Sequence, residues 1–293
     1  MLWSKAIGAG GTFGGGAAFF GPRGVFGGGA SNVIINNIDY ITIATTGNAI
    51  DFGDLAVARQ EVGATSDGSR GVFGGGRLLT AAIQYITIAT PSNSTSFGNL
   101  TVSGYQLAAT SDGSRGVFGG GEGRLNTIDY ITIATPSDAT DFGDLFQGRS
   151  GLGATSDGSR GVFGGGYLSP GNRDTIDYIT IATLSNAFDF GNLTAARARI
   201  AATSDGSRGV FGGGDNTISY ITIATTGNAI DFGDLTVARG GIAATSDGSR
   251  GVFGGGNALG DTIDYITIAT TGNAIDFGDL IVARQSLAAT SGG

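Results

Sequence analysis

An apolar segment that recurs in six copies carries large hydrophobic residues on both of its faces. In Ile128–Thr135 (IDYITIAT), alternate positions place Tyr130 on one face and Ile131 and Ile133 on the other. β-branched and aromatic residues in such alternation predict a β-strand. Because a sheet with one face in water would be polar on that face, the pattern indicates strands covered on both sides.

The apolar segments belong to a longer repeat. The block GVFGGG starts at Gly24, Gly71, Gly116, Gly161, Gly209 and Gly251, so successive copies are 47, 45, 45, 48 and 42 residues apart. A fixed period of this size indicates a repeat architecture. A unit of roughly 45 residues is too small to bury a core by itself, so the units are expected to stack into one domain.

Each unit contains four strand signals, which we label A to D. In the second unit they are Gly63–Ser66, Arg70–Phe73, Ile83–Thr90 and Ser96–Leu100, separated by turn residues. About four strands in 40–50 residues fits a propeller blade, whereas the rungs of a β-helix are shorter. The sequence therefore predicts an all-β, closed β-propeller with six four-stranded blades.

The repeat resembles the kelch repeat. A hydrophobic strand ends in a glycine pair, the next strand has a Tyr, and an aromatic residue follows, as in Phe73 with Gly74-Gly75, then Tyr85, then Phe97. The likeness covers Gly16 to about Leu287, with Phe where kelch repeats usually have Trp. The sequence segments SDGSRGVFGGG and IDYITIATTGNAIDFGDL are similar to those of kelch-like repeat proteins of bacteriophages, particularly marine ones. That resemblance implies a component of a virion or tail fibre.

The predicted organisation has three parts: an N-terminal arm at 1–15, the six-bladed propeller at 16–287, and a C-terminal closure strand at 288–293. Gly16–Phe19 is expected to be strand A of the first blade. Met1–Gly15 contains TFGGG, a partial copy of strand B, and Ser286–Gly293 copies strand A. Pairing of these two chain ends would close the ring and remove exposed sheet edges. The alternative is a partial seventh blade.

Composition excludes several kinds of chemistry. The chain has no Cys and no His, so thiolate or imidazole catalysis and zinc sites built on these residues are excluded. Its net charge is −8, which argues against nucleic acid as a partner. No apolar run has the length of a membrane span or signal peptide. We expect no catalytic residue, no metal, no cofactor and no membrane insertion.

Charged residues repeat with the units, and two interpretations were weighed. Arg recurs before strand B (as Arg70) and after strand D (as Arg149), and Asp recurs in IDY (as Asp39) and in DFGD (as Asp51 with Asp54). A ring of carboxylates could bind cations or act as acid and base. Residues reused in every repeat more often serve the repeat itself, so Arg–Asp pairing and turn capping between blades is the favoured interpretation.

Sequence variation is concentrated in two kinds of connection. The B–C inserts differ in length and sequence, and the D–A connections vary as well, whereas the A–B turn SDGSR is almost constant. In a four-stranded antiparallel blade, B–C and D–A emerge on one face, which makes that face the binding candidate. The candidate binding residues are Arg77, Leu78, Leu79, Tyr105, Arg124, Leu125, Tyr167, Leu168 and Arg173.

These observations predict a non-enzymatic structural or adhesion component of a phage virion, located on the virion or extracellularly. Its expected partners are other virion or assembly proteins, or a host surface glycan. Two alternatives stay open: a carbohydrate-active enzyme that uses Asp pairs, and a general protein-interaction scaffold.

Overall fold

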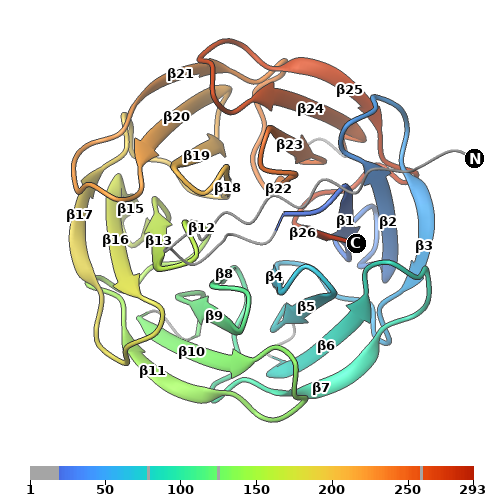
Figure 1. Cartoon of the computed structure of the whole chain (residues 1–293), viewed down its shortest axis with the longest axis horizontal. Helices are drawn as coiled ribbons and strands as arrows, with labels where there is room; N and C mark the ends of the chain where they lie inside the picture. Colours follow the sequence, from blue (N-terminus) through green and yellow to red (C-terminus); the bar gives the residue numbers. More distant parts are fainter. Residues whose placement is uncertain (1–19, 78–79, 124–125, 258–259) are drawn as a thin grey trace, which may run out of the picture.

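The computed structural model describes residues 20–77, 80–123, 126–257 and 260–293. These residues form no helix and fold into six four-stranded antiparallel sheets arranged around a central axis (Figure 1). The described part of the chain therefore contains no helix that could cross a membrane. The architecture is a six-bladed β-propeller, consistent with a kelch-like propeller.

The strands are given from the axis outward. Blade 1 contains β26 (Ala288–Gly292), β1 (Arg23–Gly27), β2 (Asn37–Thr42) and β3 (Ile50–Asp54). Blade 2 contains β4 (Gly63–Ser66), β5 (Arg70–Gly74), β6 (Ala82–Thr87) and β7 (Thr95–Asn99). Blade 3 contains β8 (Ala108–Ser111), β9 (Arg115–Gly119), β10 (Thr127–Thr132) and β11 (Thr140–Asp144).

Blade 4 contains β12 (Gly153–Ser156), β13 (Arg160–Gly164), β16 (Thr175–Thr180) and β17 (Phe188–Asn192). Its B–C insert adds a small hairpin of β14 (Tyr167–Leu168) and β15 (Gly171–Asn172). Blade 5 contains β18 (Ile200–Ser204), β19 (Arg208–Gly213), β20 (Thr217–Thr222) and β21 (Ile230–Asp234). Blade 6 contains β22 (Ala243–Ser246), β23 (Arg250–Gly254), β24 (Thr262–Thr267) and β25 (Ile275–Asp279).

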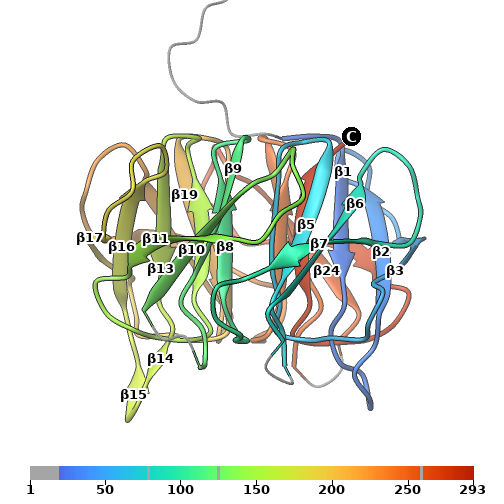
Figure 2. The same ribbon diagram turned by 90° about the horizontal axis from the view of Figure 1, so that it is seen from below.

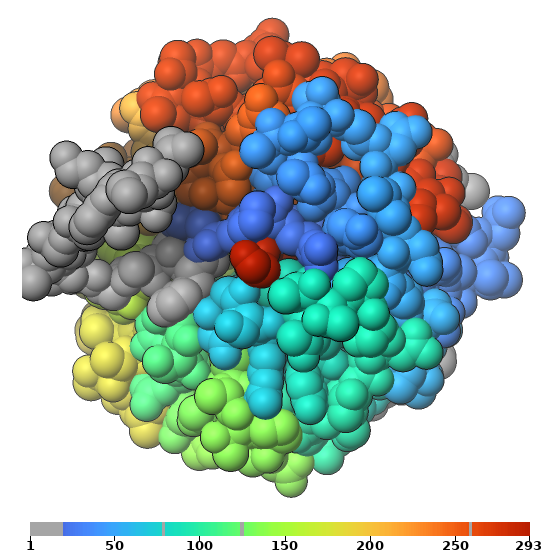
Figure 3. Space-filling model, turned by 45° about the vertical axis from the view of Figure 1, so that its right-hand side comes forward, coloured from blue at the N-terminus to red at the C-terminus, as the bar shows by residue number. Residues whose placement is uncertain are grey.

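The C-terminal strand closes the ring. β26 pairs antiparallel with β1, with Arg23 opposite Gly292 and Gly27 opposite Ala288. The red C-terminal residues consequently lie against the blue residues that begin the described chain (Figure 3). Ser286–Gly293 supplies the closing strand, but its partner is β1, and the N-terminal arm at 1–15 with which it was expected to pair lies outside the described residues. The described residues contain no seventh sheet of blade type.

Two details differ from the sequence-based expectation. Strand A of blade 1 was predicted at Gly16–Phe19, which lies outside the described residues, and β26 occupies that position in the sheet. Strand C was predicted to run to Thr90, but β6 ends at Thr87. The amide of Thr90 donates to the carbonyl of Thr87 (3.0 Å), and Ile88 donates to Ser69 across the blade, so these residues form a turn.

The glycine after each strand-B Phe makes room for the neighbouring blade. A Cβ at Gly119 would lie 2.7 Å from Cε1 of Phe163, which is fully buried. The same close contact joins Gly27 to Phe73 and Gly254 to Phe26. It therefore also occurs between blades 6 and 1, where the ring closes. The recurrence of Phe-Gly is therefore explained by packing between blades.

The two faces of the propeller differ as the topology requires. The A–B and C–D turns form one face, which we call the turn face. The B–C inserts and D–A connections form the other, which we call the variable face. The hairpin β14–β15 projects from the variable face, at the bottom of Figure 2, and the C-terminus lies at the turn face.

We expect Gly119→Ala to destabilise the propeller by about 1–3 kcal/mol, because the added methyl would overlap the Phe163 ring in a packed core. Urea denaturation monitored by circular dichroism measures the change. Gly227→Ala is the matched control, since a Cβ there meets nothing within 4 Å. Equal stability of the two variants would contradict this account of the Phe-Gly repeat.

Candidate functional site

The Arg that precedes strand B binds between blades. Arg70 donates to the carbonyls of Ile133 and Ala134 in blade 3 (3.1 and 2.8 Å). Its guanidinium also lies 4.8 Å from the ring centroid of Tyr85 in its own blade, a cation–π contact that occurs in all six blades at 4.4–4.8 Å. These Arg residues therefore use carbonyl and aromatic partners, where the sequence suggested Asp.

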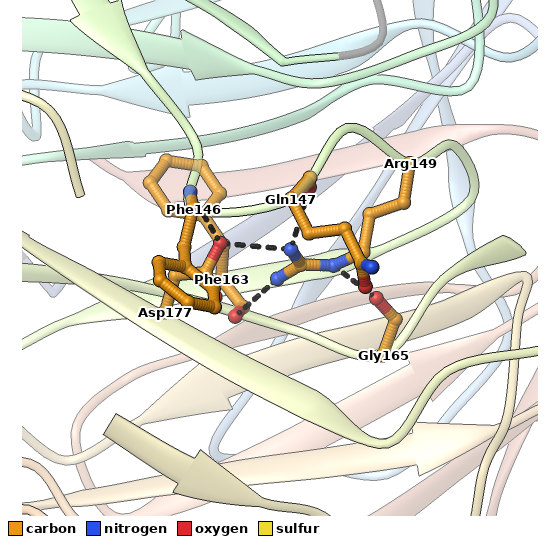
Figure 4. Close-up of polar contacts among 6 residues, drawn as sticks. All are labelled: Phe146, Gln147, Arg149, Phe163, Gly165 and Asp177. Carbon is orange, nitrogen blue, oxygen red and sulfur yellow. Dashed lines mark hydrogen bonds and ion pairs between the residues drawn. The ribbon is translucent and has the colours of Figure 1, made fainter. Parts of the chain in front are cut away.

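The Arg that follows strand D does pair with Asp. Arg149 is fully buried, and its Nη1 lies 2.8 Å from Oδ2 of Asp177 in the next blade (Figure 4). It also donates to the carbonyls of Phe163 and Gly165. Arg239–Asp264 (2.9 Å) and Arg284–Asp39 (2.8 Å) repeat this pair between other blades. The favoured interpretation of the IDY carboxylates, pairing that holds neighbouring blades together, is thus met at three interfaces.

Other interfaces replace the carboxylate. Arg197 faces Ser219 at the IDY position, and its Nη2 donates to the Ser219 hydroxyl at 2.8 Å, while its Nη1 lies 3.4 Å from Oδ1 of the partly exposed Asp215. Arg59 faces Gln84 at the equivalent place and donates to the carbonyls of Gly75 and Ala82. Burial lowers the pKa of both guanidinium groups. At the Arg59 interface a neutral side chain therefore replaces the carboxylate, and the Arg binds carbonyl groups instead.

Burial raises the pKa of the Asp39 and Asp177 carboxyl groups, and the paired Arg opposes that shift. In each carboxylate Oδ2 binds the Arg, while Oδ1 is buried without a hydrogen-bond partner. Neither group has exposed surface. These carboxylates therefore depend on the neighbouring blade for their charged state and are not reachable by a ligand.

Serine hydroxyl groups link the innermost strands near the turn face. Ser66 Oγ donates to the carbonyl of Ser291 (2.7 Å), and Ser111 Oγ donates to that of Ser66 (2.6 Å). Ser156, Ser204 and Ser246 continue the series around the axis at 2.6–2.8 Å. The repeated Ser before each Asp-Gly turn is therefore a connector between blades.

A closed ring of backbone hydrogen bonds surrounds the axis at the variable face. One residue from each D–A connection donates its amide to the carbonyl of the corresponding residue in the preceding connection, at 2.6–2.8 Å. The six residues are Glu61, Gln106, Gly151, Arg199, Gly241 and Ser286, and all have φ between 58° and 68°. We call this set the axial ring.

The left-handed conformation is unfavourable for residues other than Gly, Asn and Asp. Four of the six positions nevertheless carry other side chains, and these differ from each other. Backbone strain of this kind is concentrated at functional sites in proteins. The axial ring thus holds varied side chains at the mouth of the central channel, where a cavity of about 90 Å³ lies.

Glu61 is the most deeply buried charged member of the ring, with 9% of its surface exposed. Its Oε1 accepts a hydrogen bond from Nε2 of Gln106 (2.9 Å). Its Oε2 is buried and has no partner among the described residues. The channel mouth therefore contains a carboxylate oxygen that can still accept a hydrogen bond.

A larger cavity, of about 340 Å³, adjoins the channel mouth on the variable face. It lies between the D–A connections that enter blades 3, 4 and 5 and the hairpin of blade 4. Its lining residues are Gln106, Glu122, Ser150, Gly151, Tyr167, Asn172, Ala198 and Arg199. The volume falls within the range of about 300–1,000 Å³ typical of ligand pockets. We call it the blade-4 cavity.

Two highly variable positions of the repeat meet in this cavity. The position after GGG is Ala30, Arg77, Glu122, Tyr167, Asp215 and Asn257 in successive units, and the other position is the axial ring. Glu122 and Tyr167 come from the first position, and Gln106 and Arg199 from the second. Variation between repeats therefore converges on one concave site.

The structure places the predicted binding residues at different parts of the variable face. Tyr167 lines the blade-4 cavity and is 43% exposed. Tyr105 directly precedes the lining residue Gln106 in sequence and pairs through its backbone with Glu122. Leu168 is half-buried in the hairpin, and Arg77 is exposed in blade 2. Leu78, Leu79, Arg124 and Leu125 lie outside the described residues.

Arg173 does not line the cavity. Its Nη1 donates to the carbonyls of Gly171 and Asn172 at 3.3 Å, so the side chain bends back onto its own hairpin.

Sequence reasoning missed Gln106, Glu122, Asn172 and Arg199 as site residues. A comparison of the repeats position by position would have marked three of them, because the residue after GGG and the axial-ring residue differ between units.

The described residues contain no group of three or more Asp or Glu side chains that could hold a metal ion. Neither the protein-family models nor the curated proteins contain a match to the chain. Functional assignment therefore depends on the geometry of the variable face and on the amino-acid sequence of the repeat.

We expect Arg149→Met to lower the free energy of unfolding by about 3–5 kcal/mol, because it leaves the Asp177 carboxylate buried and unpaired. Arg59→Met is the matched control, since the residue at the equivalent place in the next blade is the neutral Gln84 and Arg59 binds carbonyl groups. Urea denaturation of both variants at pH 7 makes the comparison. An equal loss in the two would show that packing of the Arg side chain, and not the buried charge, is what matters.

The same pair predicts a pH dependence. Because burial raises the pKa of Asp177 in the folded state, its contribution to stability is greatest below the usual value of 3.8 and is lost as the pH rises through the raised pKa. Without Arg149 the pKa rises further, so Arg149→Met should lose stability more steeply than the wild type between pH 4 and 8. Adding Asp177→Asn should abolish that extra slope in denaturation curves; its persistence would contradict the assignment.

We expect Arg199→Gly to raise the free energy of unfolding by about 1 kcal/mol, because glycine adopts φ near 58° without the steric cost of a side chain. Gly151→Ala, at the equivalent ring position, should lower stability by a similar amount. Thermal and urea denaturation test both. Destabilisation by Arg199→Gly would mean that the side chain, and not the backbone, holds this part of the ring.

Proposed function

We propose that this chain is a non-enzymatic binding protein that recognises its partner with the variable face of a rigid propeller. The observation that carries the proposal is the blade-4 cavity, because two highly variable repeat positions converge on it. The blades that support it are held together by the Arg, Ser and Phe-Gly contacts that recur between them. Variable side chains on a rigid scaffold are the arrangement that binding proteins use for specificity.

We further propose that the protein works as a structural or adhesion component of a phage virion, on the particle and outside the cell. This part of the proposal is based on the resemblance of SDGSRGVFGGG and IDYITIATTGNAIDFGDL to phage kelch-like repeat proteins. Its partners would be other assembly proteins or a host surface glycan. A general interaction scaffold would have the same binding face but would not be part of a virion.

The enzymatic alternative needs Asp pairs that a substrate can reach. Asp39, Asp177 and Asp264 have no exposed surface, and each accepts from an Arg of the neighbouring blade. Among the DFGD carboxylates, Asp51 and Asp54 lie on β3, the outer strand of blade 1, away from the blade-4 cavity. The geometry therefore favours binding over hydrolysis.

We expect replacement of Tyr167–Thr175 by Asp-Asn-Thr to preserve folding and to weaken partner binding about 30-fold or more, as for loss of an anchor cluster. The three residues Asp215–Thr217 form the corresponding B–C connection in blade 5. Binding to a glycan array and incorporation into purified particles, quantified by mass spectrometry, measure the effect.

The control for this variant changes the Asp157-Gly158-Ser159 turn on the turn face. If that change abolishes binding without unfolding the protein, while the loop replacement binds as well as the wild type, the binding face has been misassigned. Absence of the protein from purified virions would contradict the proposed location.

A further inference from the structure

We propose that the blade-4 cavity binds one uncharged pyranose unit of a glycan. This inference depends on the proposed function and names the ligand class of the same face. It is argued from three features of the cavity: its mixture of hydrogen-bonding groups, its one exposed aromatic ring, and its balance of charge.

The lining combines donors and acceptors on planar groups. Arg199 supplies donors, Glu122 supplies acceptors, and the Asn172 amide supplies both. The orientation of Gln106 is set by its Nε2, which donates to Glu61 (2.9 Å) and leaves the amide oxygen as the group available to a ligand. A sugar hydroxyl both donates and accepts, so adjacent hydroxyls match such a mixed set.

Tyr167 provides the apolar contact. The residue is fixed by two backbone hydrogen bonds with Ser150, at 3.0 and 2.7 Å, while its side chain remains 43% exposed. An aromatic face offers a large apolar area together with a negative quadrupole, which suits the weakly positive C–H face of a pyranose ring. Tyr is also a frequent binding anchor because it is rigid.

The same lining argues against a peptide side chain as the occupant. Apart from Tyr167, Ala198 is the one apolar side chain among the lining residues, and no Leu, Ile, Val or Phe contributes. Anchors of peptide ligands usually fill apolar pockets. A hydroxyl-rich ring needs no such pocket.

The charges on the lining cancel. Arg199 is exposed and makes no side-chain hydrogen bond or ion pair with the described residues, and Glu122 contributes the opposite charge to the same cavity. The chain as a whole has a net charge of −8, which disfavours approach of acidic glycans. Both facts favour an uncharged sugar over a uronate or another acidic sugar.

The channel mouth extends the site toward the axis. It shares Gln106, Gly151 and Arg199 with the blade-4 cavity, and it contains the unpartnered Oε2 of Glu61. A glycan that continues past the first unit would lie over the axial ring, next to the Gln106 and Arg199 side chains that both cavities share. The two cavities together therefore fit an oligosaccharide better than a free monosaccharide.

The test uses the full chain on an array of neutral and acidic oligosaccharides, followed by calorimetric titration with the neutral oligosaccharide that gives the highest signal. We expect binding to neutral hexose-containing probes, with Tyr167→Ala and Arg199→Gly each weakening it by about tenfold or more. Asn257→Ala is the matched control for the first variant, because it changes the position equivalent to Tyr167 in blade 6, which lines neither cavity. It should bind as the wild type does.

Four results would overturn the inference. They are binding to acidic probes alone, binding unchanged in both cavity variants, equal loss of binding in Asn257→Ala, and no binding to any probe. Unchanged binding in the cavity variants, combined with loss in the Tyr167–Thr175 replacement, would refute this cavity while leaving the variable face as the binding surface. Loss of particle incorporation in that replacement, without any glycan binding, would indicate a protein partner instead.

Discussion

The fold depends on the fact that no blade can cover its own faces. Each hydrophobic cluster is shared by two adjacent blades: Phe26 and Ile41 of blade 1, for example, pack with Val252 and Ile263 of blade 6. A short sheet of four strands buries too little surface to be stable alone. Closure by β26 is therefore a condition for the core, since it gives the first and last blades the neighbours that they need.

This shared burial explains how the repeat divides between fixed and variable positions. The Phe, the following Gly, the Arg over Tyr and the Ser near each Asp-Gly turn all contact the next blade, so a change at any of them affects an interface. The axial ring is closed by backbone hydrogen bonds, to which Gln106 adds one side-chain hydrogen bond with Glu61. The exposed Arg199 side chain makes no such contact with the described residues, which leaves it available for recognition.

The architecture could be predicted because one unit is repeated six times and because apolar residues on both faces of a strand indicate stacked sheets. The ends of the strands and the partners of the repeated Arg residues were predicted less well. Ile88–Thr90 turns because the chain that follows must reach blade 1, where the Ser94 amide donates to the Asp54 carbonyl. The local pattern cannot show this contact between blades. Likewise, Gln106 and Arg199 are 93 positions apart in the chain and become neighbours of one cavity only through ring geometry.

The pairing of β26 with β1 has a consequence for how the propeller can be attached to something else. Arg23 and Gly292 face each other at the turn face, and Gly68 of blade 2 contacts Gly292 there as well. Both ends of the described chain therefore leave from the side opposite the variable face. A tether, a fusion partner or a solid support joined at the C-terminus would hold the propeller with its cavities directed outward.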